Sequence, residues 1–168
     1  MNDICLPYVG AIIEKVSPSG VELLIQTRWK PERDPLYSGT FEFPAGVMDK
    51  PFENVYETLK REIKEETGLN LLKIKNDSRT KEYTTNRDDS SFGFKPFCCT
   101  QQLKNGKPWI GFVFLCEVED GKIVPQETEV KDLRWIKRSE MESMFKNTPE
   151  KIFSLELPAW EYYFNSLF

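Results

Sequence analysis

In its first half the chain reads Gly46-Val-Met-Asp-Lys-Pro-Phe-Glu53-Asn-Val-Tyr-Glu-Thr-Leu-Lys-Arg61-Glu62-Ile-Lys-Glu65-Glu66-Thr-Gly68-Leu69. Apolar side chains at positions 55, 56, 59 and 63 recur at the spacing of one helix face, and Gly68 follows where a left-handed C-cap belongs. The pattern predicts a helix over residues 54–67. The rest of the chain is interpreted around this helix.

Three carboxylates share a narrow arc of this helix, because Glu62, Glu65 and Glu66 stand at positions i, i+3 and i+4. Like charges at this spacing cost about 0.2–0.5 kcal/mol per pair, and acidic groups in the last turn face the negative end of the helix dipole. A divalent cation such as Mg²⁺ would compensate them, since it prefers carboxylate, carbonyl and phosphate oxygens. The alternative is a solvated acidic face that Arg61 and Lys64 screen without a metal.

The stretch from Gly46 to Leu69 resembles the Nudix box of the Nudix hydrolase family, G-x5-E-x7-R-E-U-x-E-E-x-G-U, where U is apolar. It departs from that pattern at one place, because six residues instead of five separate Gly46 from Glu53. This one-residue insertion lies within residues 47–52. The interval from Glu53 to Arg61 and everything after it match the pattern.

The resemblance implies a catalytic metal, Mg²⁺ or Mn²⁺, bound to the pyrophosphate of a nucleotide substrate. By position, Glu62 and Glu66 are the expected metal ligands, Glu65 is a further ligand or the general base, and the backbone carbonyl of Ala45 is an additional ligand. The resemblance also makes four residues structural elements of the motif: Gly46, Glu53, Arg61 and Gly68, with Arg61 paired to Glu53. The metal would neutralise diphosphate oxygens and lower the pKa of a bound water for in-line attack.

Candidates outside the motif come from two places. Glu129 and Glu127 precede an expected last strand, where many Nudix enzymes carry an extra glutamate, and Glu129 is the preferred second candidate for the base. Arg28 ends an expected strand and could clamp phosphate, with Trp29 beside it as a face for base stacking. Weaker phosphate candidates are Lys30, Arg33 and Arg87, whereas Trp109 and the phenylalanines of residues 92–97 are expected in the core. The alternative for each of these cations and for Glu127 and Glu129 is an ordinary solvated side chain on the surface.

Composition predicts one soluble domain over residues 1–168, with 39% hydrophobic and 30% charged residues. The net charge of −4 argues against binding a nucleic-acid polymer. With no long apolar run and no basic leader we expect no membrane association and a cytoplasmic location. The sequence contains no histidine, which excludes His-based triads and zinc sites, and its four cysteines are expected to be buried small side chains.

The expected elements fit an α/β fold of mixed α+β type, in which a mixed sheet lies between helices, and the resemblance implies the Nudix fold. Predicted strands cover residues 8–16, 21–28, 40–43, 69–74, 81–85, 92–103, 109–118 and 130–136. Loops are predicted over 29–39 and 86–91, with a tight turn at Asn105-Gly106. Further helices are predicted over 139–145, with Ser139 as N-cap, and over 157–168, with Pro158 in the first turn.

The complete glutamate set favours a metal-dependent pyrophosphohydrolase over two alternatives, a Nudix-fold nucleotide-binding module without turnover and a coincidental motif. The Pro44-Ala45-Gly46 entry weakly favours ADP-ribose or a nucleotide sugar as substrate, although Thr85 stands where that subgroup often has proline. A (d)NTP pyrophosphohydrolase is the runner-up. The resemblance is also compatible with a homodimer.

Overall fold

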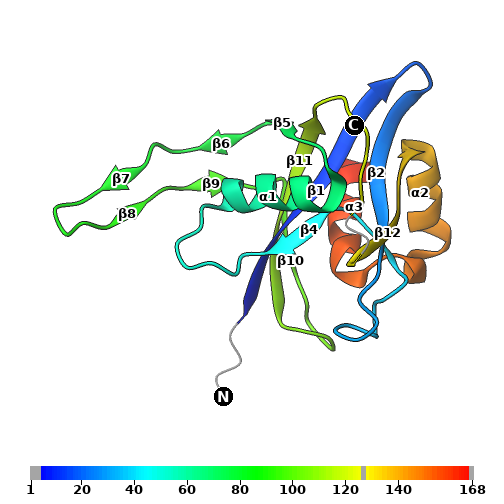
Figure 1. The fold of residues 1–168 in the computed structure, drawn as a ribbon, viewed down its shortest axis with the longest axis horizontal. Coiled ribbons are helices and arrows are strands. Elements are labelled where there is room, and N and C mark those ends of the chain that lie inside the picture. The colour runs from blue at the N-terminus through cyan, green and yellow to red at the C-terminus, as the bar shows by residue number, and fades with distance from the viewer. Residues whose placement is uncertain (1–4, 126–127, 167–168) are drawn as a thin grey trace.

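A computed structural model describes residues 5–125 and 128–166. A mixed eight-stranded sheet forms its centre, with the strand order β10-β11-β1-β2-β12 and with β3, β4 and β5 paired to β2, β1 and β11 respectively (Figure 1). These strands are β1 Leu6–Ser17, β2 Gly20–Arg28, β3 Phe41–Glu42, β4 Ala45–Val47, β5 Leu71–Ile74, β10 Cys98–Gln101, β11 Trp109–Val118 and β12 Val130–Lys137. Only β1 and β11 pair in parallel, so the predicted mixed sheet is confirmed.

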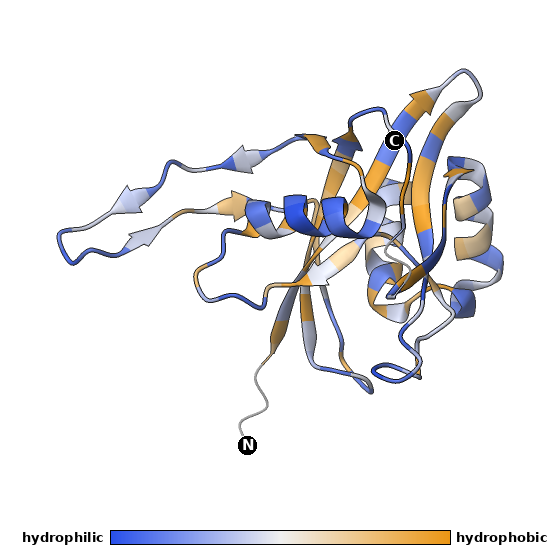
Figure 2. Ribbon diagram, in the orientation of Figure 1, coloured by the Kyte–Doolittle hydropathy of each residue, from blue (hydrophilic) through white to orange (hydrophobic). Residues whose placement is uncertain are grey.

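Helices cover both faces of the sheet, as predicted. Because side chains alternate along a strand, Val9, Ala11 and Ile13 of β1 face α1 (Val55–Thr67), whereas Ile12 faces the other side. There it packs with α2 (Arg138–Asn147) and α3 (Leu157–Asn165), which two 3₁₀ turns, η1 (Pro149–Lys151) and η2 (Ser154–Glu156), connect. Figure 2 shows the central strands as mostly hydrophobic and the outward side of α1 as hydrophilic.

The helix α1 begins and ends as its sequence predicts. The side chain of Asn54 accepts a hydrogen bond from the Tyr56 N–H as N-cap, and Gly68 ends the helix at φ 75°. This left-handed conformation favours glycine because a Cβ would be strained there. The buried face of the helix contains Val55, Tyr56, Leu59 and Ile63, together with the acidic Glu66.

A narrow two-stranded ribbon extends from the body of the protein (Figure 1). It is formed by β6 (Ser78–Arg79) with β9 (Phe94–Lys95) and by β7 (Tyr83–Thr84) with β8 (Ser90–Ser91). The single strand predicted over residues 92–103 is therefore wrong, because β9 and β10 are separate strands on either side of Pro96. At the base of the ribbon Phe92 and Phe94 contact Tyr56, which ties it to α1.

Three local predictions have mixed outcomes. Asn105 and Gly106 both have positive φ and form the predicted turn between β10 and β11. Ser139 is not the N-cap of α2, because the helix continues directly from β12 and its N-cap is Lys137, without a side-chain hydrogen bond. Cys98 and Cys116 are buried as expected, whereas the prediction was wrong for Cys5 and Cys99, which are exposed.

Within residues 5–125 and 128–166, no helix is both long and apolar enough to cross a membrane.

Candidate active site

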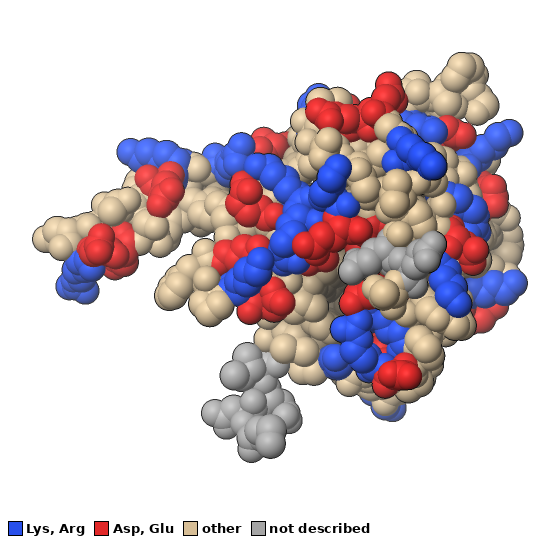
Figure 3. Space-filling view, viewed as in Figure 1, with Lys and Arg blue, Asp and Glu red and all other residues tan. Residues whose placement is uncertain are grey.

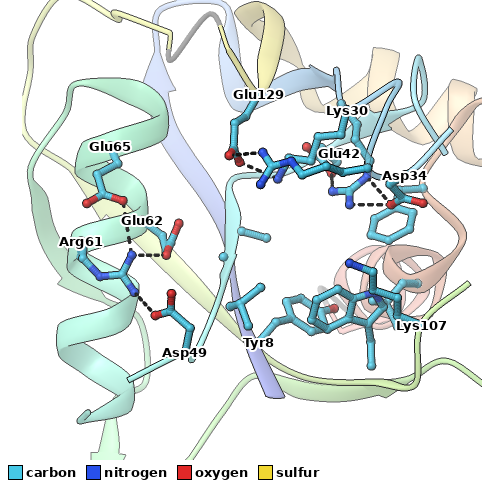
Figure 4. Close-up of a pocket in the computed structure, with 18 residues that line it drawn as sticks. Tyr8, Lys30, Asp34, Glu42, Asp49, Arg61, Glu62, Glu65, Lys107 and Glu129 are labelled. Carbon is cyan, nitrogen blue, oxygen red and sulfur yellow. Dashed lines mark hydrogen bonds and ion pairs between the residues drawn. The ribbon is translucent and has the colours of Figure 1, made fainter. Parts of the chain in front are cut away.

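A cavity of about 290 Å³ lies between α1, β4 and the loop that follows β2 (Figure 4). Acidic and basic side chains lie close together over this part of the surface (Figure 3). The residues that line the cavity include six predicted from the sequence as ligands, bases, phosphate contacts or motif residues: Ala45, Gly46, Arg61, Glu62, Glu65 and Glu129. The predicted phosphate candidates Arg28, Lys30 and Arg33 line it as well.

Gly46 provides the space in which the carboxylate of Glu62 lies. A Cβ placed on Gly46 would lie 1.8 Å from Cδ and 2.0 Å from Oε2 of Glu62, which is far inside van der Waals contact. Gly46 belongs to β4, which is hydrogen-bonded to β1. The glycine therefore allows Glu62 of α1 to lie directly against β4.

Arg61 is surrounded by acidic groups. Its Nε and Nη2 donate to the two carboxylate oxygens of Glu53 at 3.2 and 3.3 Å, and its Nη1 donates to Glu62 and, at 3.3 Å, to Glu65. Asp49 lies 3.7 Å away as a further ion pair. These hydrogen bonds, that to Glu53 first, raise the pKa of the guanidinium and keep it charged. Arg61 thus holds together two of the expected metal ligands.

Glu66 lies behind the cavity wall, almost completely buried. Its Oε2 accepts hydrogen bonds from Nε2 of Gln26 at 2.8 Å and from the N–H of Ala45 at 2.9 Å. Burial, and next the negative charge of Glu42, raise the pKa of Glu66 to about 8. Neither hydrogen bond supplies a full positive charge, so the ionised carboxylate is incompletely compensated.

Glu129 stands on the wall opposite α1 (Figure 4) and is paired with two cations. Lys30 Nζ lies 2.8 Å from its Oε2, and Arg33 bonds to its other oxygen. Burial disfavours the charged form of Glu129, but the hydrogen bonds from Lys30 and Arg33 outweigh this effect and lower its pKa. Its predicted partner Glu127 lies outside the described residues.

Arg28 lines the cavity but is already bound to carboxylates, with Nη1 2.9 Å from Glu42 and Nη2 2.6 Å from Asp34. Trp29 is 38% exposed, packs under Lys131 and is not one of the residues that line the cavity. The third weak phosphate candidate, Arg87, lies in the turn between β7 and β8 of the ribbon. The structure therefore brings Lys30 and Arg33 to the site more directly than Trp29 or Arg87.

The one-residue insertion is taken up by an exposed turn. The N–H of Glu53 donates to the carbonyl of Lys50 at 3.2 Å, and Phe52 adopts a positive φ of 61° with its side chain in solvent. Glu53 still reaches Arg61 after this turn. The pairing of Arg61 with Glu53 that the motif implies is therefore present despite the insertion.

A family model described as NUDIX domain matches residues 7–155. The chain belongs to the Nudix hydrolase family. It is accordingly an enzyme of the pyrophosphohydrolase class, as the complete glutamate set predicts. None of the curated proteins compared with the chain matches it.

Solved structures share the Nudix fold at low sequence identity. The chain is similar to a MutT protein from Methanosarcina mazei Go1, with 17% identity, a TM-score of 0.68 and coverage of 100% of this chain and 99% of that chain. The chain is also similar to the NUDIX domain of Shewanella oneidensis NrtR complexed with ADP ribose, with 12% identity and a TM-score of 0.66. The match covers 98% of this chain and 90% of that chain. A third similar structure is a C. elegans Ap4A hydrolase binary complex, with 17% identity and a TM-score of 0.58. The match covers 96% of this chain and 99% of that chain. At these identities the likeness shows the fold alone.

Nudix hydrolases in general depend on a divalent metal, and the charges of this chain fit one. Glu42, Glu66 and Glu156 are fully buried, and burial raises the pKa of all three, with mutual repulsion adding to the effect on Glu66 and Glu156. Only Arg28 among the described cations bonds to any of the three. Oε1 of Glu156 is also buried without a hydrogen-bond partner. Burial thus disfavours the ionised form of these clustered carboxyls, and a hard divalent cation nearby would stabilise that form.

The ligand set itself is not assembled in the described residues, where no three acidic side chains converge on one point. Glu62 and Glu65 are bound to Arg61, and Glu66 faces Gln26 and Ala45. A metal bound by these carboxylates would therefore have to compete with Arg61 for Glu62 and Glu65.

Sequence reasoning missed one part of the Nudix cavity. Tyr8, Lys107, Trp109, Phe153 and Leu155 line it, and Trp109, predicted to be core, is only partly buried. The signal lies in the parallel pairing of β1 and β11, which brings residues about 100 positions apart into contact. Local sequence patterns do not report such pairing.

The buried carboxylates predict how stability depends on pH. Because the folded chain holds the Glu66 proton up to about pH 8 while the unfolded chain loses it near 4.5, the free energy of unfolding falls as pH rises through this window. Without metal, we expect a slope of up to about 1.4 kcal/mol per pH unit for each proton taken up on folding. The measurement is chemical denaturation in EDTA between pH 5 and 8.5.

Two features isolate this effect. The sequence has no histidine to titrate in the window, and groups with lowered pKa such as Glu129 act below about 4.5. Glu66→Gln should reduce the slope by the share of Glu66 and leave that of Glu42 and Glu156, whereas the exposed Glu57→Gln should leave the slope unchanged. A wild-type protein whose stability is constant over this range would refute the buried-charge account.

The contact between Gly46 and Glu62 predicts the effect of Gly46→Ala. The atoms in the way belong to the flexible end of Glu62, so the variant should fold and displace this carboxylate. We expect at least a tenfold loss of metal-dependent kcat/KM, on the order of 1.4 kcal/mol in transition-state stabilisation, with little change in melting temperature. Gly93→Ala in the exposed ribbon is the matched control. Full activity of Gly46→Ala would show that the position of Glu62 is unimportant.

Proposed function

We propose that this enzyme hydrolyses a pyrophosphate bond in a nucleoside diphosphate linked to another moiety, with a weak preference for ADP-ribose or a nucleotide sugar. The observation that carries the proposal is the charge arrangement of one cavity. Glu62 and Glu65 lie on one wall, and Lys30 and Glu129 lie on the other (Figure 4). Arg33 lines the same cavity and is paired with Glu129. A diphosphate between these walls would meet cations on one side and metal-binding carboxylates on the other.

The metal would be Mg²⁺, or Mn²⁺, held by Glu62, Glu65, Glu66 and the carbonyl oxygen of Ala45. When bound, it neutralises diphosphate oxygens and acidifies a water molecule. The protein's own residues then orient the substrate. Lys30 and Arg33 exchange the carboxylate of Glu129 for phosphate oxygens, and this exchange frees Glu129 to accept a proton.

Two relatives support the substrate class without fixing it. The NrtR domain was solved with ADP ribose, and the C. elegans protein is named as an Ap4A hydrolase. Both ligands contain an adenine nucleotide joined through phosphates. A (d)NTP pyrophosphohydrolase and a binding module without turnover are the competing functions.

The first test measures phosphate release, with and without added phosphatase, from ADP-ribose, nucleotide sugars, dinucleoside polyphosphates and (d)NTPs. We expect release in Mg²⁺, none in EDTA, and the highest kcat/KM with ADP-ribose or a nucleotide sugar. Glu66→Gln should lose most activity and keep its fold, because it removes a ligand charge without changing volume. Glu57→Gln is the control. Wild-type turnover in Glu66→Gln would refute the metal assignment, and turnover of (d)NTPs alone would establish the runner-up.

The second test separates the two candidates for the base. Glu129→Gln should lower kcat by about 10²–10⁴-fold while KM changes little, since Glu129 lies opposite the predicted ligands and is available for proton transfer. Glu65→Gln should instead weaken the dependence on Mg²⁺ concentration. A nearly normal kcat for Glu129→Gln would move the role of base to Glu65.

A further inference from the structure

One end of the cavity differs from the rest in chemistry. Tyr8, Trp109, Phe153 and Leu155 line it, with the exposed Lys107 at its rim, and we call these five residues the aromatic end. In Figure 4, Tyr8 and Lys107 lie across the cavity from Glu65 and Glu129. Four of these five side chains are aromatic or aliphatic, so this end suits the part of a ligand that is not phosphate.

The two rings are held in place by strand pairing. Tyr8 of β1 is the register partner of Gly111 in β11, and Trp109 lies two residues before Gly111 on the same face. A Cβ on Gly111 would lie 2.1 Å from Cε1 of Tyr8, so the glycine allows the tyrosine ring to lie across the strand. The ring then meets Trp109 at 6.2 Å between centroids, nearly perpendicular to it. Such a preformed pair loses little side-chain entropy when a ligand binds.

At this end few polar groups are free to form hydrogen bonds with the edge of a ligand ring. The hydroxyl of Tyr8 already shares a hydrogen bond of 2.7 Å with Oγ1 of Thr100, and burial raises its pKa, so it stays neutral. Lys107 lies on a flexible stem, with Nζ 5.7 Å from the centroid of Trp109. A partly exposed indole with few fixed hydrogen-bond partners favours a flat aromatic ring and discriminates weakly among rings.

We propose that the aromatic end binds the nucleobase of the substrate, which stacks on Trp109, and that this subsite accepts purines and pyrimidines alike. The inference rests on the proposed function and deepens it. The enzyme would then select nucleoside diphosphate derivatives by the presence of a base, whichever base it is, and by the group attached to the other end of the diphosphate. Trp109 thereby takes the role that the sequence assigned to Trp29.

The test uses AMP, which has no pyrophosphate bond and is not consumed, and ribose 5-phosphate, the same ligand without the base. Calorimetric titrations are made with Mg²⁺. Trp109→Ala should bind AMP about 5- to 100-fold more weakly than wild type. It should bind ribose 5-phosphate as wild type does. Trp109→Phe, which keeps a ring, should retain most of the affinity for AMP. An equal loss for both ligands, or no loss for AMP, would overturn the proposal.

Tryptophan fluorescence gives a second readout that does not need Trp109→Ala to fold. AMP should quench wild-type emission, and this quenching should vanish in Trp109→Phe while binding persists. It should remain in the control Trp135→Phe, which changes a tryptophan of β12 outside the cavity lining. Loss of AMP affinity in Trp29→Ala, with none in Trp109→Ala, would return the stacking role to Trp29.

Base tolerance is tested with GMP, UMP and CMP, whose dissociation constants should lie within about tenfold of that of AMP. A single strongly preferred base would overturn this part. The outcome is independent of turnover. If AMP binding depends on Trp109 but no substrate is hydrolysed, the base subsite stands and the proposed hydrolysis is refuted. If a substrate is hydrolysed but AMP binding does not depend on Trp109, the hydrolysis stands and the base subsite is refuted.

Discussion

The carboxylate of Glu66 connects the three parts of the structure on which the site depends. One of its oxygens accepts hydrogen bonds from Gln26 of β2 and from the N–H of Ala45 in β4, so α1, β2 and β4 meet at one buried atom. Burying a carboxylate that has no full positive partner costs free energy, which appears as its pKa of about 8. The buried Glu66 carboxyl therefore lowers the stability of the metal-free protein at the position where we propose that a divalent cation binds.

The surrounding charges extend the same arrangement. Arg61 holds Glu62 and Glu65 at the cavity surface, while the carboxyl groups of Glu42 and Glu156 are buried near Glu66 and burial raises the pKa of both. Opposing cations stand across the cavity and are neutralised by Glu129. The free protein therefore satisfies its site with internal ion pairs. A ligand that brings both a divalent cation and phosphate oxygens could replace these pairs on both walls together.

The sequence was sufficient where the structure is local. Helix periodicity, the Gly68 cap and the position of Glu66 beside the apolar stripe follow from spacing along α1. Three features needed contacts between distant residues. The base of the ribbon depends on pairing of β6 with β9 across more than ten residues, and the aromatic end depends on parallel pairing of β1 with β11. Arg28 is occupied by Glu42 of β3, another strand. The N-cap expected at Ser139 failed because β12 continues into α2 without a break.

The central claim is that the carboxylates of α1, with the backbone carbonyl of Ala45 in β4, hold a divalent cation. The most direct measurement is the anomalous scattering of Mn²⁺ in a crystal of this protein grown with the metal. The account predicts a peak about 2 Å from oxygens of Glu62, Glu65 or Glu66 and of Ala45, with Arg61 withdrawn from at least one carboxylate. A map with no peak at α1, or with a peak only elsewhere on the surface while Arg61 keeps its partners, would contradict it.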